Sequence, residues 1–283
     1  MTALLRAFNY FIFTSVFIAG CAMMMVLQTH DLLSLHLNLK AYLSFVFFAT
    51  LSSYNFHWYL TPDISSENAR VRWTQQHKKL HLALCGVGAI GAGWIFLQFI
   101  HQWYWLLGAV VLTFLYSAPK LPVGPFYALK KIAIGKTLFL SFVWTYVTTI
   151  LPIAFDHQSW NQAALFFILS RFFLIYAICI IFDYRDRDYD RKEGIRSMIT
   201  WFSEQAVNRL FYFTIVLFII STAALYYYGF SLLTICCLLS TLLFLLPLYP
   251  VAKKNFSDYL YYFVLDGLMM FSAILTTLIP RSA

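Results

Sequence analysis

Long apolar runs separated by short polar connections repeat along the whole chain. A helix that crosses a membrane needs about 20 mostly apolar residues. Nine runs approach this requirement, near residues 8–27, 41–60, 80–100, 102–117, 137–155, 162–182, 209–228, 231–250 and 258–279. We therefore expect an all-α polytopic membrane protein with nine transmembrane helices. No polar domain or flexible linker interrupts these runs, so residues 1–283 are expected to form a single integral-membrane domain.

The composition agrees with this pattern. Hydrophobic residues make up 61% and charged residues 11% of the 283 positions, and the mean hydropathy is +0.71. This balance excludes an ordinary soluble protein. The five cysteines all lie within expected spans, so neither a disulfide framework nor a zinc-binding pattern is indicated.

The net charge of +8 could suggest a nucleic-acid partner, but the cations lie between apolar runs, where they would set membrane orientation. If the N-terminus is cytoplasmic, all but three of the 20 Lys and Arg residues fall on the cytoplasmic side. The exceptions are Lys40 and Arg281 outside and Arg171 within a span. We predict a cytoplasmic N-terminus and cytoplasmic aspartate-rich loops, an external C-terminus, a bacterial inner membrane, and no nucleic-acid partner.

An acidic and basic cluster follows the apolar run that ends near residue 182. Asp183, Asp186 and Asp190 are spaced i, i+3, i+7, so on a helix they share one face, whereas Asp188 does not. Carboxylates on one face can bind Mg²⁺, and the neighbouring cations suit a diphosphate. A solvated loop near the membrane would explain the cations, but not four aspartates among only 12 acids in the chain.

The series Asp183-x-x-Asp186-x-x-x-Asp190-Arg191 after a long span resembles the second aspartate-rich motif of the UbiA-type intramembrane prenyltransferases. The resemblance implies a UbiA-like helical bundle from end to end. It also implies Mg²⁺-binding roles for Asp183, Asp186 and Asp190, and a diphosphate-binding role for Arg191.

A second segment, Tyr116-Ser-Ala-Pro-Lys120, is similar to the family's Tyr-x-x-x-Lys element. The resemblance implies that Tyr116 and Lys120 bind diphosphate, while an interfacial aromatic and an orientation-setting cation are the alternative. Arg70 and Arg72 could also contact phosphate, and we include Arg72 among the expected diphosphate-binding residues. Membrane orientation alone explains both arginines equally well.

The family's first aspartate-rich motif is only partly present. Asn55 and Asp63 match it and are the expected metal ligands there, but Phe56 and Tyr59 stand where two aspartates belong. Neither replacement can bind Mg²⁺ as a carboxylate does. The intact second motif therefore argues more strongly for diphosphate binding than for a complete two-metal site.

The resemblance implies Mg²⁺-dependent transfer of an isoprenoid chain from a prenyl diphosphate to a hydrophobic or aromatic acceptor within the membrane lipid. No catalytic residue is assigned. The main alternative is a non-catalytic membrane protein of the same descent that binds prenyl diphosphate or lipid. A transporter that uses Arg171 and Asp266 within its spans, and a phosphatidyltransferase, are further alternatives, although Asp266-Gly267 lacks the Ala-Arg continuation of the latter.

Overall fold

The computed structural model describes residues 3–61, 69–120, 135–156, 160–192 and 194–278, and these residues form helices and no strand. All five cysteines lie within the described residues and are free in the structure. The elements in chain order are α1 Ala3–Phe13, α2 Val16–Leu33, α3 Leu39–Tyr59, α4 Ala69–Gln76, α5 Lys78–Phe96, η1 Leu97–Gln102, α6 Trp103–Ser117, η2 Ala118–Lys120, α8 Lys136–Thr145, η3 Tyr146–Ile150, α9 Leu151–Phe155, α10 Gln162–Lys192, α11 Met198–Trp201, α12 Glu204–Ala224, η4 Leu225–Tyr228, α13 Leu232–Leu239, α14 Leu242–Ala252, η5 Leu260–Leu265 and α15 Asp266–Thr277.

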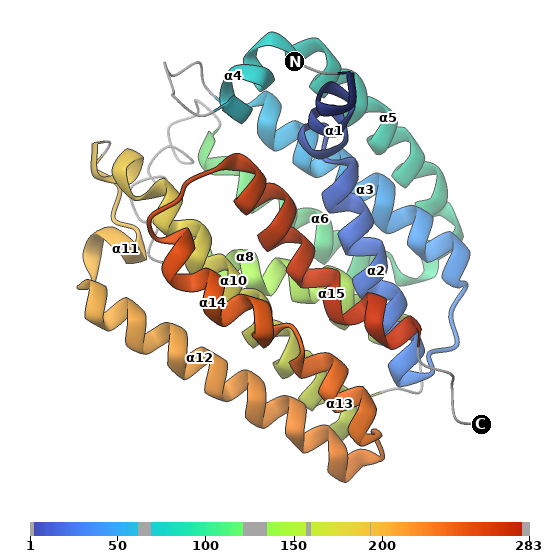
Figure 1. Cartoon of the computed structure of the whole chain (residues 1–283). Coiled ribbons are helices and arrows are strands. Elements are labelled where there is room, and N and C mark those ends of the chain that lie inside the picture. The colour runs from blue at the N-terminus through green and yellow to red at the C-terminus, as the bar shows by residue number, and fades with distance from the viewer. Residues whose placement is uncertain (1–2, 62–68, 121–134, 157–159, 193, 279–283) are drawn as a thin grey trace.

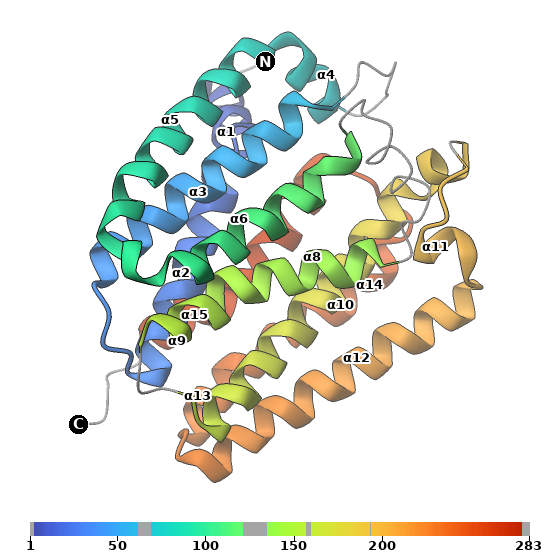
Figure 2. The ribbon, with the colours of Figure 1, turned by 180° about the vertical axis from the view of Figure 1, so that it is seen from behind.

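Seven helical segments of the described chain are long and apolar enough to cross a membrane, so length and apolarity do not recover the expected count of nine. Two expected runs fall in one segment, Lys78–Ser117, which the short element η1 divides. The chain reverses there between α5 and α6 (Figure 2). Helix α3 has the length of a span, but polar residues such as Asn55 and His57 make it less apolar. The count of nine stays a prediction.

The first expected run does not form one continuous helix. Ser15 has a left-handed backbone with φ 66° and separates α1 from α2. The Asn55 side chain donates a hydrogen bond of 2.9 Å to the carbonyl of Thr14 at this break. A buried carbonyl without a partner is costly, so this contact from α3 stabilises the break.

The long helices form a bundle in which α2, α3, α6, α8, α10 and α15 surround the interior (Figures 1 and 2). Helix α5 packs outside α3, and α12 packs outside α10. One buried hydrophobic cluster extends from Phe17 on α2 to Met269 on α15. Helix α4, the end of α6, the start of α8 and the end of α10 lie toward the same end of the bundle (Figure 2).

Close packing of α5 fixes the position of α3. A Cβ atom at Gly88 would lie 2.7 Å from both the carbonyl oxygen of Phe48 and the backbone nitrogen of Ser52. The Ser52 hydroxyl also donates a 3.0 Å hydrogen bond to the carbonyl of Cys85. Because only glycine permits this approach, the α3–α5 pair holds the end of α3 rigidly beside the polar end of the bundle.

Candidate diphosphate and metal site

The aspartate-rich segment forms the C-terminal part of α10. The candidate membrane span Gln162–Asp188 includes Asp183 and Asp186, and the helix continues to Lys192 with Arg191 and Lys192 in its last turn. Cations at a helix C-terminus interact favourably with the helix dipole. Gly194 then adopts φ +64°, and the backbone N–H of Ile195 donates 2.8 Å to the carbonyl of Asp190. This C-terminal cap ends the helix after the motif and not within it.

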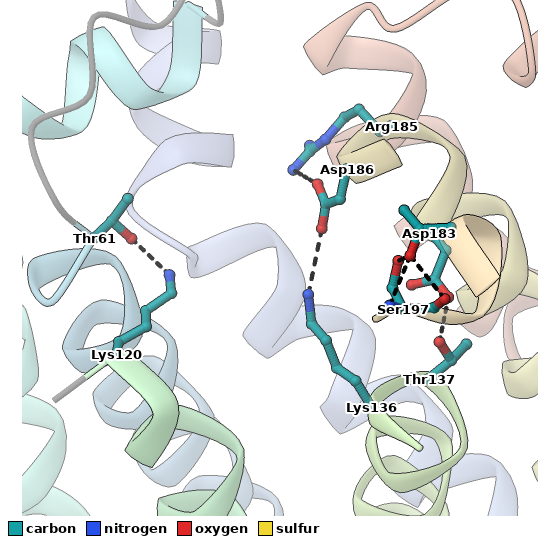
Figure 3. A network of polar contacts seen from close by, with 9 residues as sticks. Thr61, Lys120, Lys136, Thr137, Asp183, Arg185, Asp186 and Ser197 are labelled. Atoms are coloured by element: carbon teal, nitrogen blue, oxygen red, sulfur yellow. Dashed lines mark hydrogen bonds and ion pairs between the residues drawn. The ribbon is translucent and has the colours of Figure 1, made fainter. Parts of the chain in front are cut away.

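Asp186 lies between two cations (Figure 3). Its Oδ2 atom is 3.4 Å from Nζ of Lys136, the first residue of α8, and its Oδ1 atom is 3.5 Å from Nη2 of Arg185. Neither cation is a matched residue of a motif that the sequence indicates for the site. Lys136 was explained by membrane orientation, and only its parity with the aspartate-rich segment across the spans could have indicated the contact.

Asp183 is buried one turn earlier on α10 and accepts a hydrogen bond from the hydroxyl of Thr137. Thr137 directly follows Lys136, so the start of α8 contacts both carboxylates (Figure 3). Asp190 is also buried, whereas Asp188 is exposed and pairs with Arg187 at 3.3 Å. The different environment of Asp188 agrees with its expected place off the shared helix face.

The three expected aspartate ligands do not converge on one point. Within the described residues, no group of three or more His, Cys, Asp or Glu side chains could hold a metal ion. Asp183 is bonded to Thr137 and Asp186 to two cations. Mg²⁺ commonly binds one or two carboxylates together with phosphate oxygens of the substrate. The donor set therefore fits Mg²⁺ that binds with a diphosphate, and the metal-binding roles stay predictions.

Lys120 lies at the end of α6 and faces the end of α3 (Figure 3). Its Nζ atom donates 2.7 Å to the hydroxyl of Thr61 and 3.3 Å to the carbonyl of His57. Burial, and next the positive charge of Lys136, lower the pKa of the Lys120 amine well below its usual value. Within the described residues no ion pair joins Lys120 to a carboxylate, so a phosphate beside it would favour its ammonium form.

Tyr116 stacks on His57, with ring centroids 5.1 Å apart and an interplanar angle of 19°. The imidazole Nδ1 of His57 is 3.3 Å from the hydroxyl of Ser117. Tyr116 and Lys120 therefore both contact His57 at the end of α3. These contacts hold the end of α6 against α3, and the diphosphate role of Tyr116 stays a prediction.

Arg70 is almost completely buried, unlike Arg72, which is exposed on the same short helix α4. The Arg70 guanidinium lies 4.1 Å from the ring centroid of Trp58 and 4.0 Å from that of Tyr262. Burial lowers the pKa of Arg70 to about 10. The guanidinium of Arg185 lies 4.4 Å from the same Tyr262 ring, so this ring contacts two cations beside Asp186.

The remaining expected ligands are placed differently. Asn55 is fully buried, where its amide donates to the carbonyls of Thr14 and Leu51 and its oxygen lies 2.7 Å from Nδ1 of His81. A metal-binding role for Asn55 stays a prediction and would require it to exchange these bonds. Asp63 lies outside the described residues. Arg191 is exposed on the last turn of α10.

The two charged residues expected within spans do not pair with each other. Arg171 is buried, and it donates hydrogen bonds to the oxygen of Gln28 and, at 3.1 Å, to the hydroxyl of Ser272. In the part of the chain that the structure describes, Asp266 forms no ion pair. The structure therefore shows no direct contact between Arg171 and Asp266 that would support the transporter alternative.

Comparison with solved structures identifies the fold. A UbiA homolog from Archaeoglobus fulgidus superimposes with a TM-score of 0.57 at 14% identity, over 96% of this chain and 100% of that chain. The structure of a UbiA homolog from the same organism bound to GPP and Mg²⁺ gives a TM-score of 0.55 at 14% identity, over 94% and 100% of the two chains. A Cd²⁺-bound structure gives 0.53 at 14% identity, with the same coverage. At this identity the likeness shows the fold alone.

The family model described as the UbiA prenyltransferase family matches residues 68–265, which is more than half of the 283 residues. The matched range includes Lys120, Lys136 and the aspartates of α10, but not Asn55 or Asp63. A comparison with curated proteins gives no match. The family match and the bundle geometry together confirm the expected UbiA-like helical fold. The chain belongs to the UbiA prenyltransferase family.

Proposed function

We propose that this protein is a Mg²⁺-dependent intramembrane prenyltransferase that binds a prenyl diphosphate at the polar end of α10. The observation that carries the proposal is the contact of Asp186 with Lys136 and Arg185 from two helices. Carboxylate and cations side by side would provide a place for Mg²⁺ and for the anionic oxygens of a diphosphate. The structures of UbiA homologs with GPP and Mg²⁺, and with Cd²⁺, support this ligand class and a divalent metal.

The side chains have distinct proposed roles. Asp186 and Asp183 would hold Mg²⁺ together with diphosphate oxygens, and Mg²⁺ supplies charge stabilisation to the departing pyrophosphate. Lys136, Arg185 and Lys120 would neutralise the remaining negative charge. The bond between the allylic carbon and the diphosphate oxygen breaks, with its electron pair leaving on pyrophosphate. The acceptor forms the new bond to that carbon and loses a proton.

The bundle would exclude water from this reaction. The guanidinium of Arg185 on α10 lies against the aromatic rings of Tyr261 and Tyr262. Exclusion of water strengthens charge interactions and protects an allylic cation from hydrolysis. We propose a hydrophobic or aromatic acceptor because it would approach through the membrane lipid.

The test compares pyrophosphate release by the purified full-length protein with Asp186→Ala and Asp188→Ala variants. Each reaction contains Mg²⁺, a prenyl diphosphate from a panel of chain lengths, and a panel of phenolic and lipid-like acceptors. Asp188→Ala is the matched control, because Asp188 is exposed and, among the residues that the structure describes, forms its ion pair with Arg187. We expect release by the wild type and by Asp188→Ala, and at least about a hundredfold loss in Asp186→Ala. Equal rates in the two variants would refute the site assignment.

A non-catalytic prenyl-diphosphate-binding protein is the second candidate. Two observations favour it: Phe56 and Tyr59 replace two aspartates of the first motif, and the Asn55 side chain is engaged within the core. Calorimetric titration with a prenyl diphosphate, with and without Mg²⁺, separates the two functions. Mg²⁺-dependent binding of the prenyl diphosphate, with no pyrophosphate release for any combination of prenyl diphosphate and acceptor, would establish this second function in place of prenyl transfer.

We further propose that the site faces the cytoplasm and that the membrane is the inner membrane of a bacterium. The excess of Lys and Arg on one side of the expected spans supports this orientation. Labelling of a single introduced cysteine at Lys192 by a membrane-impermeant reagent, in a variant without other cysteines, tests it. The cysteine should be labelled only after the inner membrane has been made permeable. Labelling in intact spheroplasts would show that this end of α10 faces outward, opposite to the proposed orientation.

A further inference from the structure

A basic pocket lies near the end of α10, and neither Asp183 nor Asp186 is among its lining residues. It is formed where α10, α12 and α14 end or begin, and it is lined by Tyr184, Arg187, Glu204, Pro250, Lys253 and Lys254. Three of these side chains are cationic and one is acidic. The pocket therefore has an excess of positive charge, which favours an anionic ligand.

The apolar segments around this pocket indicate its level relative to the membrane. Three candidate membrane spans, Gln162–Asp188, Glu204–Tyr228 and Leu232–Ala252, each have one end within a few residues of the lining side chains. The ends of apolar spans mark the level at which lipid headgroups meet the protein. The pocket thus lies where the phosphate groups of membrane lipids are found.

Lys253 is held in a fixed position within the pocket. Its Nζ atom is 2.6 Å from Oε1 of Glu204 and donates 2.9 Å to the side-chain oxygen of Asn208. The rings of Tyr184 and Tyr249 each have their centroid 5.1 Å from this amine. Such contacts order the lysine before a ligand arrives, which lowers the entropy cost of binding.

Two further features favour an anionic lipid over a soluble anion. Helix α12 begins at Glu204 behind the cap Ser203, so its positive dipole end lies at the pocket. Next to the pocket, Val251 follows the lining residue Pro250, and the Tyr212 ring lies 6.0 Å from that of Tyr249. Both side chains are exposed, at 49% and 54%. Exposed apolar surface next to a basic pocket suits acyl chains beside a headgroup.

We infer that this pocket binds the phosphate headgroup of an anionic membrane phospholipid. Lys254 and Arg187 contact the headgroup together with Lys253, and the acyl chains lie along Tyr212 and Val251. Arg187 also pairs with Asp188 at 3.3 Å, so the lipid phosphate shares this cation with an exposed carboxylate. This site is independent of the proposed prenyl transfer, because it uses different side chains of α10.

Native mass spectrometry of the delipidated full-length protein, titrated with phosphatidylglycerol or phosphatidylcholine, tests the inference. We compare the wild type with an Arg187→Ala/Lys254→Ala variant and with a Lys78→Ala/Lys79→Ala control. The control removes two cations from the start of another candidate span, Lys78–Ser117, outside the pocket. We expect phosphatidylglycerol affinity to fall about fivefold for each removed pocket cation, and to change less than about twofold in the control.

Three results would overturn the inference. They are equal phosphatidylglycerol affinity in the pocket variant and the wild type, an equal loss in the control variant, and equal affinity of the wild type for phosphatidylcholine. Addition of glycerol 3-phosphate distinguishes a lipid from a soluble phosphate ligand. If glycerol 3-phosphate displaced all of the phosphatidylglycerol when present at the same concentration as the lipid, the lipid assignment would also be overturned. Lys254→Ala alone, at an exposed position, provides a folded second variant if thermal unfolding shows that the double variant is unstable.

Discussion

The Nζ atom of Lys136 lies 3.4 Å from Oδ2 of Asp186, although 50 residues separate them in the chain. The two side chains retain 41% and 34% of their exposure. Ion pairs that water can reach contribute little to stability. The pair is therefore better explained by the charge that it presents to a ligand than by a role in holding α8 against α10.

Replacement of Lys136 by Gln should weaken ligand binding more than it weakens the fold. We expect the affinity for a prenyl diphosphate with Mg²⁺ to fall about tenfold or more, because a charge-assisted hydrogen bond is lost. The free energy of unfolding should change by no more than about 1 kcal/mol. Calorimetric titration and thermal unfolding measure the two effects. Lys192→Gln, at an exposed position on the same end of α10, is the control, and equal losses of affinity would contradict the prediction.

Lys120 should give diphosphate binding a characteristic pH dependence. Burial lowers the pKa of this lysine, so its positive charge is present below that pKa and is lost at a lower pH than for an ordinary lysine. Affinity for a prenyl diphosphate should consequently fall as pH rises through the lowered pKa. Lys120→Arg should move this fall upward by at least about one pH unit, because a guanidinium stays protonated. Binding measured over the whole pH range in which the protein stays folded checks this, and superimposable profiles of the wild type and Lys120→Arg would exclude Lys120 from the site.

Asn55 should behave as a structural residue when its amide is replaced by a carboxylate. Asn55→Asp loses the hydrogen bonds to the carbonyls of Thr14 and Leu51 and places negative charge beside them. We expect a loss of stability of about 2 kcal/mol. A Mg²⁺ titration followed by thermal unfolding distinguishes the metal-binding alternative, since a carboxylate that binds metal would recover stability as Mg²⁺ is added.

Gly88 should be far less tolerant of alanine than Gly86. A Cβ at Gly88 would meet the backbone of Phe48 and Ser52 at 2.7 Å, whereas a Cβ at Gly86 meets nothing within 4 Å. Gly88→Ala must push α5 away from α3, at a cost of about 1–3 kcal/mol. Gly86→Ala should be neutral or slightly stabilising, because alanine favours the helix. Unfolding midpoints of the two variants in the same detergent provide the comparison.

Gln28 should matter because it partners a buried cation. Arg171 donates to Gln28 and Ser272, and Gln28 in turn donates 2.9 Å to the hydroxyl of Thr276. Gln28→Leu leaves the Arg171 guanidinium with fewer acceptors, so we expect a loss of about 2–3 kcal/mol. Adding Arg171→Met removes the stranded charge and should recover part of this loss. A double variant less stable than Gln28→Leu would show that the arginine stabilises the bundle by other contacts.

Residue patterns alone predicted the all-helical membrane fold, since apolar runs of this length have few other stable forms in lipid. The 3.6-residue helical period similarly placed Asp188 apart from Asp183 and Asp186, and the structure gives Asp188 its own exposed pairing. Such features depend on neighbours a few residues away. The family resemblance was also readable from a single continuous segment of α10.

Only the tertiary structure decided which side chains meet at the site. The sequence explains Lys136 by membrane orientation, whereas the packing of α8 on α10 places it beside Asp186. The hydrogen bonds of Asn55 with Thr14 and His81 could not be read from the sequence either, and its metal-binding role stays a prediction. The break at Ser15 likewise depends on a contact from α3. Contacts between distant segments depend on how helices pack and on which buried polar groups must be satisfied, and a local pattern contains neither.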